Sequence, residues 1–110
     1  KVNFSAFQKQ IKNNDRVIEL KNPKNKKSLT FFLRTKKAQV ENLRLKLVAK
    51  NKTEVIKIEV ENFQELRSNP EIVVSFFEID IEAYPNQEIK LDFSGSVPNS
   101  LPIIEYVSFN

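Results

Sequence analysis

The stretch NLRLKLVAKNKTEVIKIEVE spans residues 42–61, and apolar and polar side chains alternate along most of it. A period of two is typical of a half-buried β-strand, because successive side chains leave opposite faces. With a two-residue turn at Asn51-Lys52, Leu47 would face Ile56 on the buried side. The sequence therefore predicts an antiparallel hairpin with one apolar face. That face consists of Leu43, Leu45, Leu47, Ile56, Ile58 and Val60.

The hairpin also marks a change in the sign of charge along the chain. The net charge is +4, but residues 1–52 carry a net of +12 and residues 53–110 a net of −8. In the predicted register Arg44 lies opposite Glu59, so the two halves would neutralise each other where their strands interleave. The alternative is a bipolar surface, which would favour oriented docking or head-to-tail contacts.

Length and composition indicate one folded domain. The 110 residues are 40% apolar and 29% charged, which is ordinary for a globular protein. No apolar run approaches the ~20 residues of a membrane helix, so we expect no membrane insertion. We expect residues 1–110 to form a single domain. Because the chain begins at Lys1, both a processed protein and a domain excised from a larger protein fit.

Short apolar or alternating runs, separated by turn residues, predict the remaining strands. They lie over residues 16–20, 28–34, 71–83, 89–93 and 103–109. Because the last of these is apolar on nearly both sides, we expect it at a central position. Residues 1–12 fit a short strand, with a helical turn as the alternative.

Two segments depart from simple alternation. Along residues 71–83 the apolar side chains first occupy positions 72, 74 and 76 and then switch to positions 77, 79, 81 and 83. A bulge near Ser75 would explain this switch. Otherwise, another part of the protein must cover Ile72, Val74 and Phe76. Residues 62–69 have a capping pattern and are followed by proline, so they predict at most two turns of helix that plug one end of a sheet.

Seven to eight short strands with almost no helix indicate an all-β, immunoglobulin-like β-sandwich, with a small β-barrel as the alternative. The stretch from Leu43 through Val60, followed by IEAYPNQEIKLDF, resembles the strand rhythm of such domains in secreted glycosidases and adhesion proteins. This resemblance is to a superfold, which does not determine function. The resemblance favours a secreted or cell-surface location. The cysteine and tryptophan of antibody domains are absent.

The composition argues against catalysis. The chain has no histidine, no cysteine and one glycine, so it lacks the usual general base, thiolate nucleophile and phosphate-binding loops. Glu78, Asp80 and Glu82 share one strand face, but alternating carboxylates of this kind are typical of a solvated surface. We therefore expect no enzyme, no metal site and no cofactor.

Apolar side chains at outward positions suggest where a partner would bind. Against their alternating neighbours, Phe32, Val48 and Val55 fall on the face expected to meet solvent, and Val74 and Phe76 join them if no bulge intervenes. A contiguous apolar patch marks an interaction site. We therefore expect a non-catalytic accessory or interaction module that docks a protein partner or a neighbouring domain, either on these residues or on one unpaired sheet edge. The candidate interaction surface is Phe32, Val48, Val55, Val74 and Phe76.

Two other partners are alternatives. Lysines and arginines on both sides of Phe32 would suit single-stranded nucleic acid, which combines phosphate contacts with base stacking. A glycan-binding module is the other alternative, although Tyr84 is expected in a turn and Tyr106 in a buried strand. The candidate basic patch is Lys21, Lys24, Lys26, Lys27, Arg34, Lys36 and Lys37.

Overall fold

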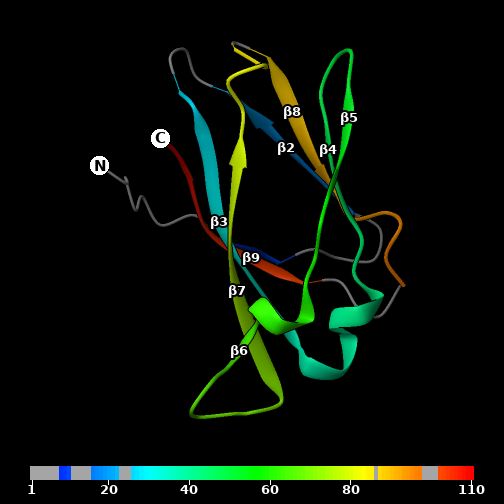
Figure 1. Ribbon diagram of the computed structural model, residues 1–110, viewed down its shortest axis with the longest axis vertical. Helices are drawn as coiled ribbons and strands as arrows, with labels where there is room; N and C mark the ends of the chain where they lie inside the picture. Colours follow the sequence, from blue (N-terminus) through cyan, green and yellow to red (C-terminus); the bar gives the residue numbers. More distant parts are fainter. Residues whose placement is uncertain (1–7, 11–15, 23–25, 86, 98–101) are drawn as a thin grey trace.

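A computed structural model describes residues 8–10, 16–22, 26–85, 87–97 and 102–110. Its strands form two antiparallel sheets packed face to face, with 3-10 turns near one end and a hairpin tip at the other (Figure 1). The first sheet has the order β1 (Gln8–Gln10), β9 (Ile103–Phe109), β3 (Ser28–Lys36), β7 (Ile72–Asp80) and β6 (Gln64–Glu65). The second has the order β2 (Val17–Lys21), β8 (Glu88–Asp92), β4 (Leu45–Val48) and β5 (Thr53–Ile56).

The predicted all-β, immunoglobulin-like sandwich is confirmed. The neighbours β3-β7-β6 and β8-β4-β5 correspond to the B-E-D and F-C-C′ strands of immunoglobulin domains. The terminal strands exchange sheets, since β9 takes the place of the first strand beside β3, and β2 takes that of the last strand beside β8. The alternative of a small barrel is wrong, because both sheets end in outer strands and do not close on each other.

The core lies between the sheets and is formed by the inward side chains of both. On β3, the fully buried Phe31 stacks on Phe77 of β7, with ring centroids 5.4 Å apart and an interplanar angle of 5°. Apolar burial of this extent is the main favourable term in folding a domain of this size. The most deeply buried core side chains also include Ile18, Leu29, Leu33, Leu45, Leu47, Ile89, Leu91 and Phe93.

The β4–β5 hairpin forms with the predicted faces but a different register. Leu45, rather than Leu47, lies opposite Ile56. The amide of Ala49 donates to the carbonyl of Lys52 over 2.8 Å, so the turn begins one residue earlier than the sequence indicated. A shift of two residues keeps Leu45, Leu47 and Ile56 on their predicted face, because the side-chain period is two. Alternation therefore determines the faces but not the register. Val60, which was predicted to face inward, instead lies in a 3-10 turn and is 48% exposed.

The shifted register also removes the predicted contact between Arg44 and Glu59. The Arg44 guanidinium instead donates to the carbonyls of Glu41 and Leu43, over 2.8 and 2.7 Å. Glu59 pairs with Lys57 on its own segment, with Nζ and Oε1 2.9 Å apart. Charge neutralisation at this hairpin is thus local rather than between the two halves of the chain.

The predicted bulge near Ser75 is absent. Nine consecutive residues of β7 pair with β3 without interruption, so Val74 and Phe76 face outward in phase. The bulge lies instead between β3 and β9, where the register shifts between Thr30 and Phe32. One residue of β3 there faces two of β9, and Tyr106 takes up the irregularity with a φ of 54°.

The predicted helix over residues 62–69 is also wrong. A single 3-10 turn, η2 (Val60–Asn62), is followed at once by β6 and a turn into β7. Phe63 packs edge-on against Phe77 at 6.2 Å, so this segment does plug the core. The Leu66 amide donates to the Ile72 carbonyl over 2.9 Å, and this bond satisfies the backbone without a helix. A longer 3-10 segment, η1 (Lys37–Asn42), joins β3 to β4.

The remaining expectations for the strands agree with the structure. Residues 17–21 form β2, and β9 occupies the expected central position between β1 and β3. Of the N-terminal twelve residues, 8–10 form a strand, whereas the expectation for residues 1–7 and 11–12 lies outside the described part of the chain.

We expect Phe31→Ala to lower the free energy of unfolding by about 3–5 kcal/mol, because it leaves a cavity beside Phe77. Urea unfolding followed by circular dichroism measures this change. Val55→Ala is the matched control, since Val55 is 74% exposed. It should change stability by less than about 0.5 kcal/mol. Equal losses in the two variants would contradict the assignment of Phe31 to the centre of the core.

Candidate functional site

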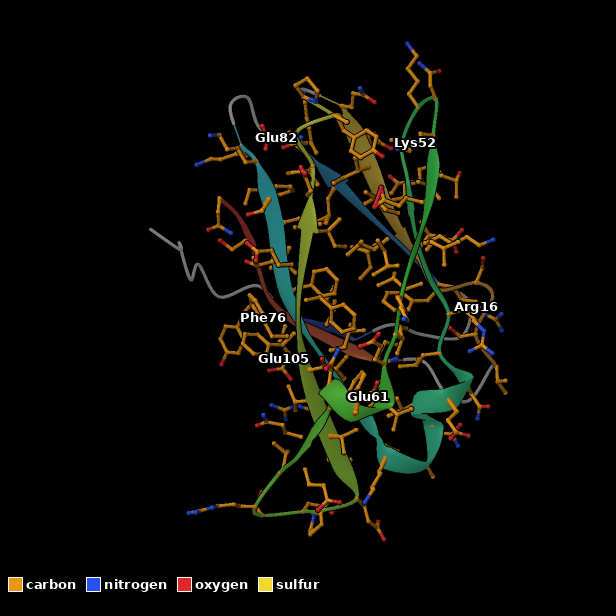
Figure 2. All side chains as sticks on the ribbon, in the orientation of Figure 1. Arg16, Lys52, Glu61, Phe76, Glu82 and Glu105 are labelled. Carbon is orange, nitrogen blue, oxygen red and sulfur yellow. The ribbon has the colours of Figure 1, made fainter. Side chains whose placement is uncertain are left out.

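Three aromatic side chains gather on the outer face of the five-stranded sheet, and we call them the ring cluster: Phe32, Phe76 and Tyr106. The Phe32 ring lies 5.1 Å from that of Phe76 and 6.0 Å from that of Tyr106. Phe76 is 52% exposed and Tyr106 is 47% exposed. Phe76 lies on the outer side of β7 in Figure 2. Large apolar side chains that are half open to water and touch one another are uncommon away from interaction sites.

Tyr106 joins the ring cluster because of the bulge in β9. The sequence indicated a buried Tyr106, since its neighbours along the strand are apolar. The extra residue in β9 re-aims the side chain outward, which is a frequent effect of bulges. A positive φ at a bulky residue such as Tyr106 is rare and has no marker in this sequence. Only a glycine or asparagine at the bulge would have indicated it beforehand.

An ion pair lies beside the ring cluster, between Arg34 of β3 and Glu105 of β9. The Arg34 Nε atom is 2.7 Å from Glu105 Oε1, and Nη2 donates to Oε2 over 3.2 Å. The Glu105 side chain is only 5% exposed, whereas that of Arg34 is 40% exposed. The buried carboxylate is therefore compensated by a cation that still reaches solvent. Sequence reasoning assigned no role to Glu105.

The five residues of the candidate interaction surface do not form one surface. Phe32, Val74 and Phe76 lie on the outer face of the first sheet, where Arg34 and Val74 are direct partners across the strands. Val48 and Val55 belong to β4 and β5 of the second sheet and face away from the core on the opposite side of the sandwich. The prediction of a single contiguous surface is wrong, because alternation identifies outward residues without indicating the sheet.

The residues of the candidate basic patch are also separated. Lys26 and Lys27 precede β3, whereas Lys36 and Lys37 lie at its other end, roughly 25–30 Å away for a strand of this length. Lys21 ends β2 in the other sheet, and Lys24 lies outside the described residues.

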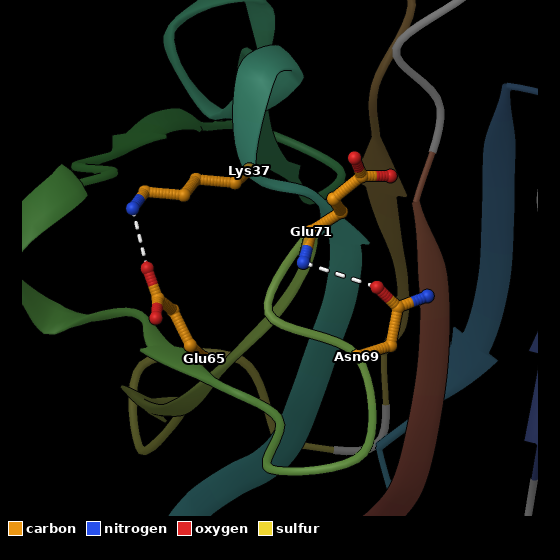
Figure 3. A network of polar contacts seen from close by, with 4 residues as sticks. All are labelled: Lys37, Glu65, Asn69 and Glu71. Atoms are coloured by element: carbon orange, nitrogen blue, oxygen red, sulfur yellow. Dashed lines mark hydrogen bonds and ion pairs between the residues drawn. The ribbon is translucent and has the colours of Figure 1, made fainter.

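Two of the basic residues have acidic partners. Arg34 is paired with Glu105. The Lys37 ammonium group donates to the carboxylate of Glu65 (Figure 3). In the adjoining turn the Asn69 side chain accepts a hydrogen bond from the Glu71 amide, which holds the loop between β6 and β7 (Figure 3). The lysines that the structure describes therefore do not form the continuous cationic track that a nucleic acid strand would require.

A hollow of about 390 Å³ lies between β5 and β7, and we call it the edge groove. Its apolar lining consists of Val55, Ile56, Phe76, Phe77 and Ile79. Its charged lining consists of Glu54, Lys57, Glu59, Glu78 and Asp80. A second hollow of about 470 Å³ lies beside the ring cluster, between Phe32, Phe76 and the residues of β6.

Within the edge groove, Lys57 and Glu59 perturb each other. The hydrogen bond from Lys57, its positive charge and a hydrogen bond from Asn62 hold the pKa of Glu59 below its ordinary value. The same pair raises the pKa of Lys57. Glu59 therefore stays ionised at a lower pH than a free glutamate, and its charge is partly balanced by Lys57.

Comparisons and geometry assign no known chemistry to the chain. No family model matches the sequence, and no curated protein matches it either. Among the described residues, no three acidic side chains come together in a way that would hold a metal ion. None of the helical segments in this part of the chain has the length and apolar character needed to cross a bilayer.

We expect Arg34→Met to destabilise the fold by about 1–3 kcal/mol, because Glu105 would keep a buried charge without its partner. Replacing both residues, with Glu105→Leu as the second change, should cost less than the sum of the single changes. A double-mutant cycle from urea unfolding measures this coupling. Strict additivity would mean that the pair does not interact in solution.

We expect Lys57→Gln to return the pKa of Glu59 towards its ordinary value, because the largest causes of the shift are removed. The stabilisation from this pair is present above the ordinary pKa of glutamate and is lost as the pH falls through the lowered value. Carboxyl chemical shifts recorded against pH by NMR give the midpoint. Lys52→Gln, at the tip of the hairpin, is the control and should leave that midpoint unchanged. An unchanged midpoint in Lys57→Gln would contradict the pairing.

Proposed function

We propose that this protein is a non-catalytic interaction module that docks a protein partner or a neighbouring domain on the ring cluster. The observation that carries the proposal is the half-exposure of Phe76 and Tyr106 around the central ring of Phe32. Aromatic residues dominate the energetics of protein interfaces, because they bury a large area and have few rotatable bonds. Val74 and the hollow beside β6 extend the same apolar area.

The orientation of the rings favours a protein over a flat ligand. The Phe32 plane is tilted by 57° from that of Phe76 and by 83° from that of Tyr106. Nucleic acid bases stack on open ring faces, whereas rings packed edge to face offer no common plane. An uneven apolar surface of this kind suits the irregular side chains of a protein. The adjacent Arg34–Glu105 pair contributes no net charge, so it adds little attraction for a polyanion.

A glycan is the second candidate, because Tyr106 is 47% exposed and carries both a ring and a hydroxyl group. Its support is weaker, since the neighbouring rings do not continue the plane of Tyr106. Single-stranded nucleic acid has less support still, because the lysines lie at opposite ends of β3.

Selection from a phage-displayed random peptide library tests the proposal. We expect enriched peptides whose affinity falls about tenfold or more in Tyr106→Ser, which corresponds to the loss of one interface anchor. Val55→Ser is the matched control, because it removes an exposed apolar side chain from the opposite sheet. Its affinity for the same peptides should not change.

Two outcomes would overturn this assignment. Peptides that bind both variants as they bind the natural protein would remove the ring cluster as the docking site. Affinity electrophoresis on a polysaccharide panel, with retardation lost in Tyr106→Ser, would replace a protein partner with a glycan. A fluorescent oligothymidylate should not bind at low salt.

A further inference from the structure

The longest free edge among the described residues belongs to β7. This strand pairs with β3 along all nine of its residues. On its other side β6 covers only Val73 and Val74. From Ser75 to Asp80, β7 has no ladder partner on that side within the described chain. Such an edge presents unpaired backbone donors and acceptors to whatever lies beside it.

The path of the chain explains why this edge is uncovered. A straight continuation of the β6 register beyond Gln64 would bring preceding residues opposite Phe76, Glu78 and Asp80. Instead η2 turns the chain away from β7 and leads it across to β5 in the other sheet. The edge groove is the space left between β5 and β7 by this crossing.

The free edge also lacks most of the usual protections against pairing. Natural edge strands are guarded by lysine, proline, bulges or very short length. Residues 75–80 read SFFEID, without lysine or proline, and they pair with β3 without a bulge. The charges present are two carboxylates, Glu78 and Asp80, which repel acidic strands and attract basic ones.

The lining of the edge groove indicates which strand would fit. Ile56, Phe77 and Ile79 provide apolar contacts from both sheets. Glu54 and Glu59 approach from the β5 side, and Glu78 and Asp80 belong to β7. The one cation of the lining, Lys57, is already paired with Glu59. An extended segment lying here would meet apolar surface and an excess of negative charge.

We propose that the edge groove binds an extended cationic peptide segment, which adds to β7 as a strand beside residues 75–80. Strand addition supplies main-chain hydrogen bonds, while alternate side chains supply specificity. One set of alternate side chains packs on the apolar lining, and lysines or arginines in the other set pair with the carboxylates. The site shares Phe76 with the ring cluster but uses the backbone edge of β7 rather than the outer face of the sheet. The inference does not depend on the proposed function.

Titration of peptides into the complete ¹⁵N-labelled chain tests the inference by NMR. The probe is acetyl-KVKVKVK-amide. Two matched probes are its acidic counterpart, acetyl-EVEVEVE-amide, and a KVKVKVK peptide whose central residues are N-methylated to remove their backbone donors. We expect the cationic probe to shift and protect the amides of residues 75–80. Both matched probes should bind at least about tenfold more weakly at physiological salt.

Charge variants of the protein locate the site. Glu78→Lys combined with Asp80→Lys should weaken binding of the cationic probe by about tenfold or more. Glu71→Lys combined with Glu82→Lys changes the net charge equally at the two ends of β7 and should have a much smaller effect. Tyr106→Ser should leave binding unchanged, because Tyr106 belongs to the ring cluster and does not line the edge groove.

Each contrary result is informative. Equal affinity for the cationic and N-methylated probes would overturn strand addition, because charge alone would then explain binding. Amide shifts confined to other residues, or no binding, would overturn the site. Sedimentation of the unliganded chain as a dimer that dissociates in the Glu78→Lys, Asp80→Lys variant would assign the edge to a second copy instead of a peptide.

Discussion

The pairing of β3 with both β7 and β9 is the interaction on which the rest of the structure depends. The inward residues of β3 are fully buried and form the centre of the core. Its outward residues include Phe32, which packs against Phe76 and Tyr106, and Arg34, which pairs with Glu105. One strand thus positions both the core and the candidate surface. Successive side chains of β3 point to opposite faces of the sheet. The close packing of its inward residues in the core therefore also fixes the position of its outward residues.

Sequence alternation predicted the layers of this fold but not their alignment. The inward faces of β3, β4 and β8 follow directly from the spacing of their leucines and isoleucines. The hairpin register did not follow, because a shift of two residues leaves every face unchanged. The bulge in β9 did not follow either, since Tyr106 adopts a positive φ without glycine or asparagine. Tertiary pairing, not local propensity, determines both features.

The candidate surface was predictable only in part, because alternation indicates the face of a residue and not the pairing of its strand. Phase against neighbouring residues correctly indicated that Phe32 points away from the core, whereas the direction of Val74 and Phe76 depended on whether a bulge lies near Ser75. It placed Val48 and Val55 in the same group, although they lie on the other sheet. Residue type and phase carry no information about which sheet a strand joins. The partners that complete the site, Tyr106 and Glu105, come from the last strand and depend on long-range pairing.

The same topology determines where the acidic and basic halves of the sequence lie in the fold. Across most of the fold the two halves interleave, as where β3 pairs with β7 and β4 with β5. The edge groove and the short β6–β7 pair beside it are exceptions, because β5, η2, β6 and β7 all follow residue 52 and belong to the acidic half. Residues 53–82 contain eight acidic and two basic side chains. The crossing that leaves β7 uncovered is therefore made by the segment that carries the negative charge, so an open edge and an acidic lining coincide.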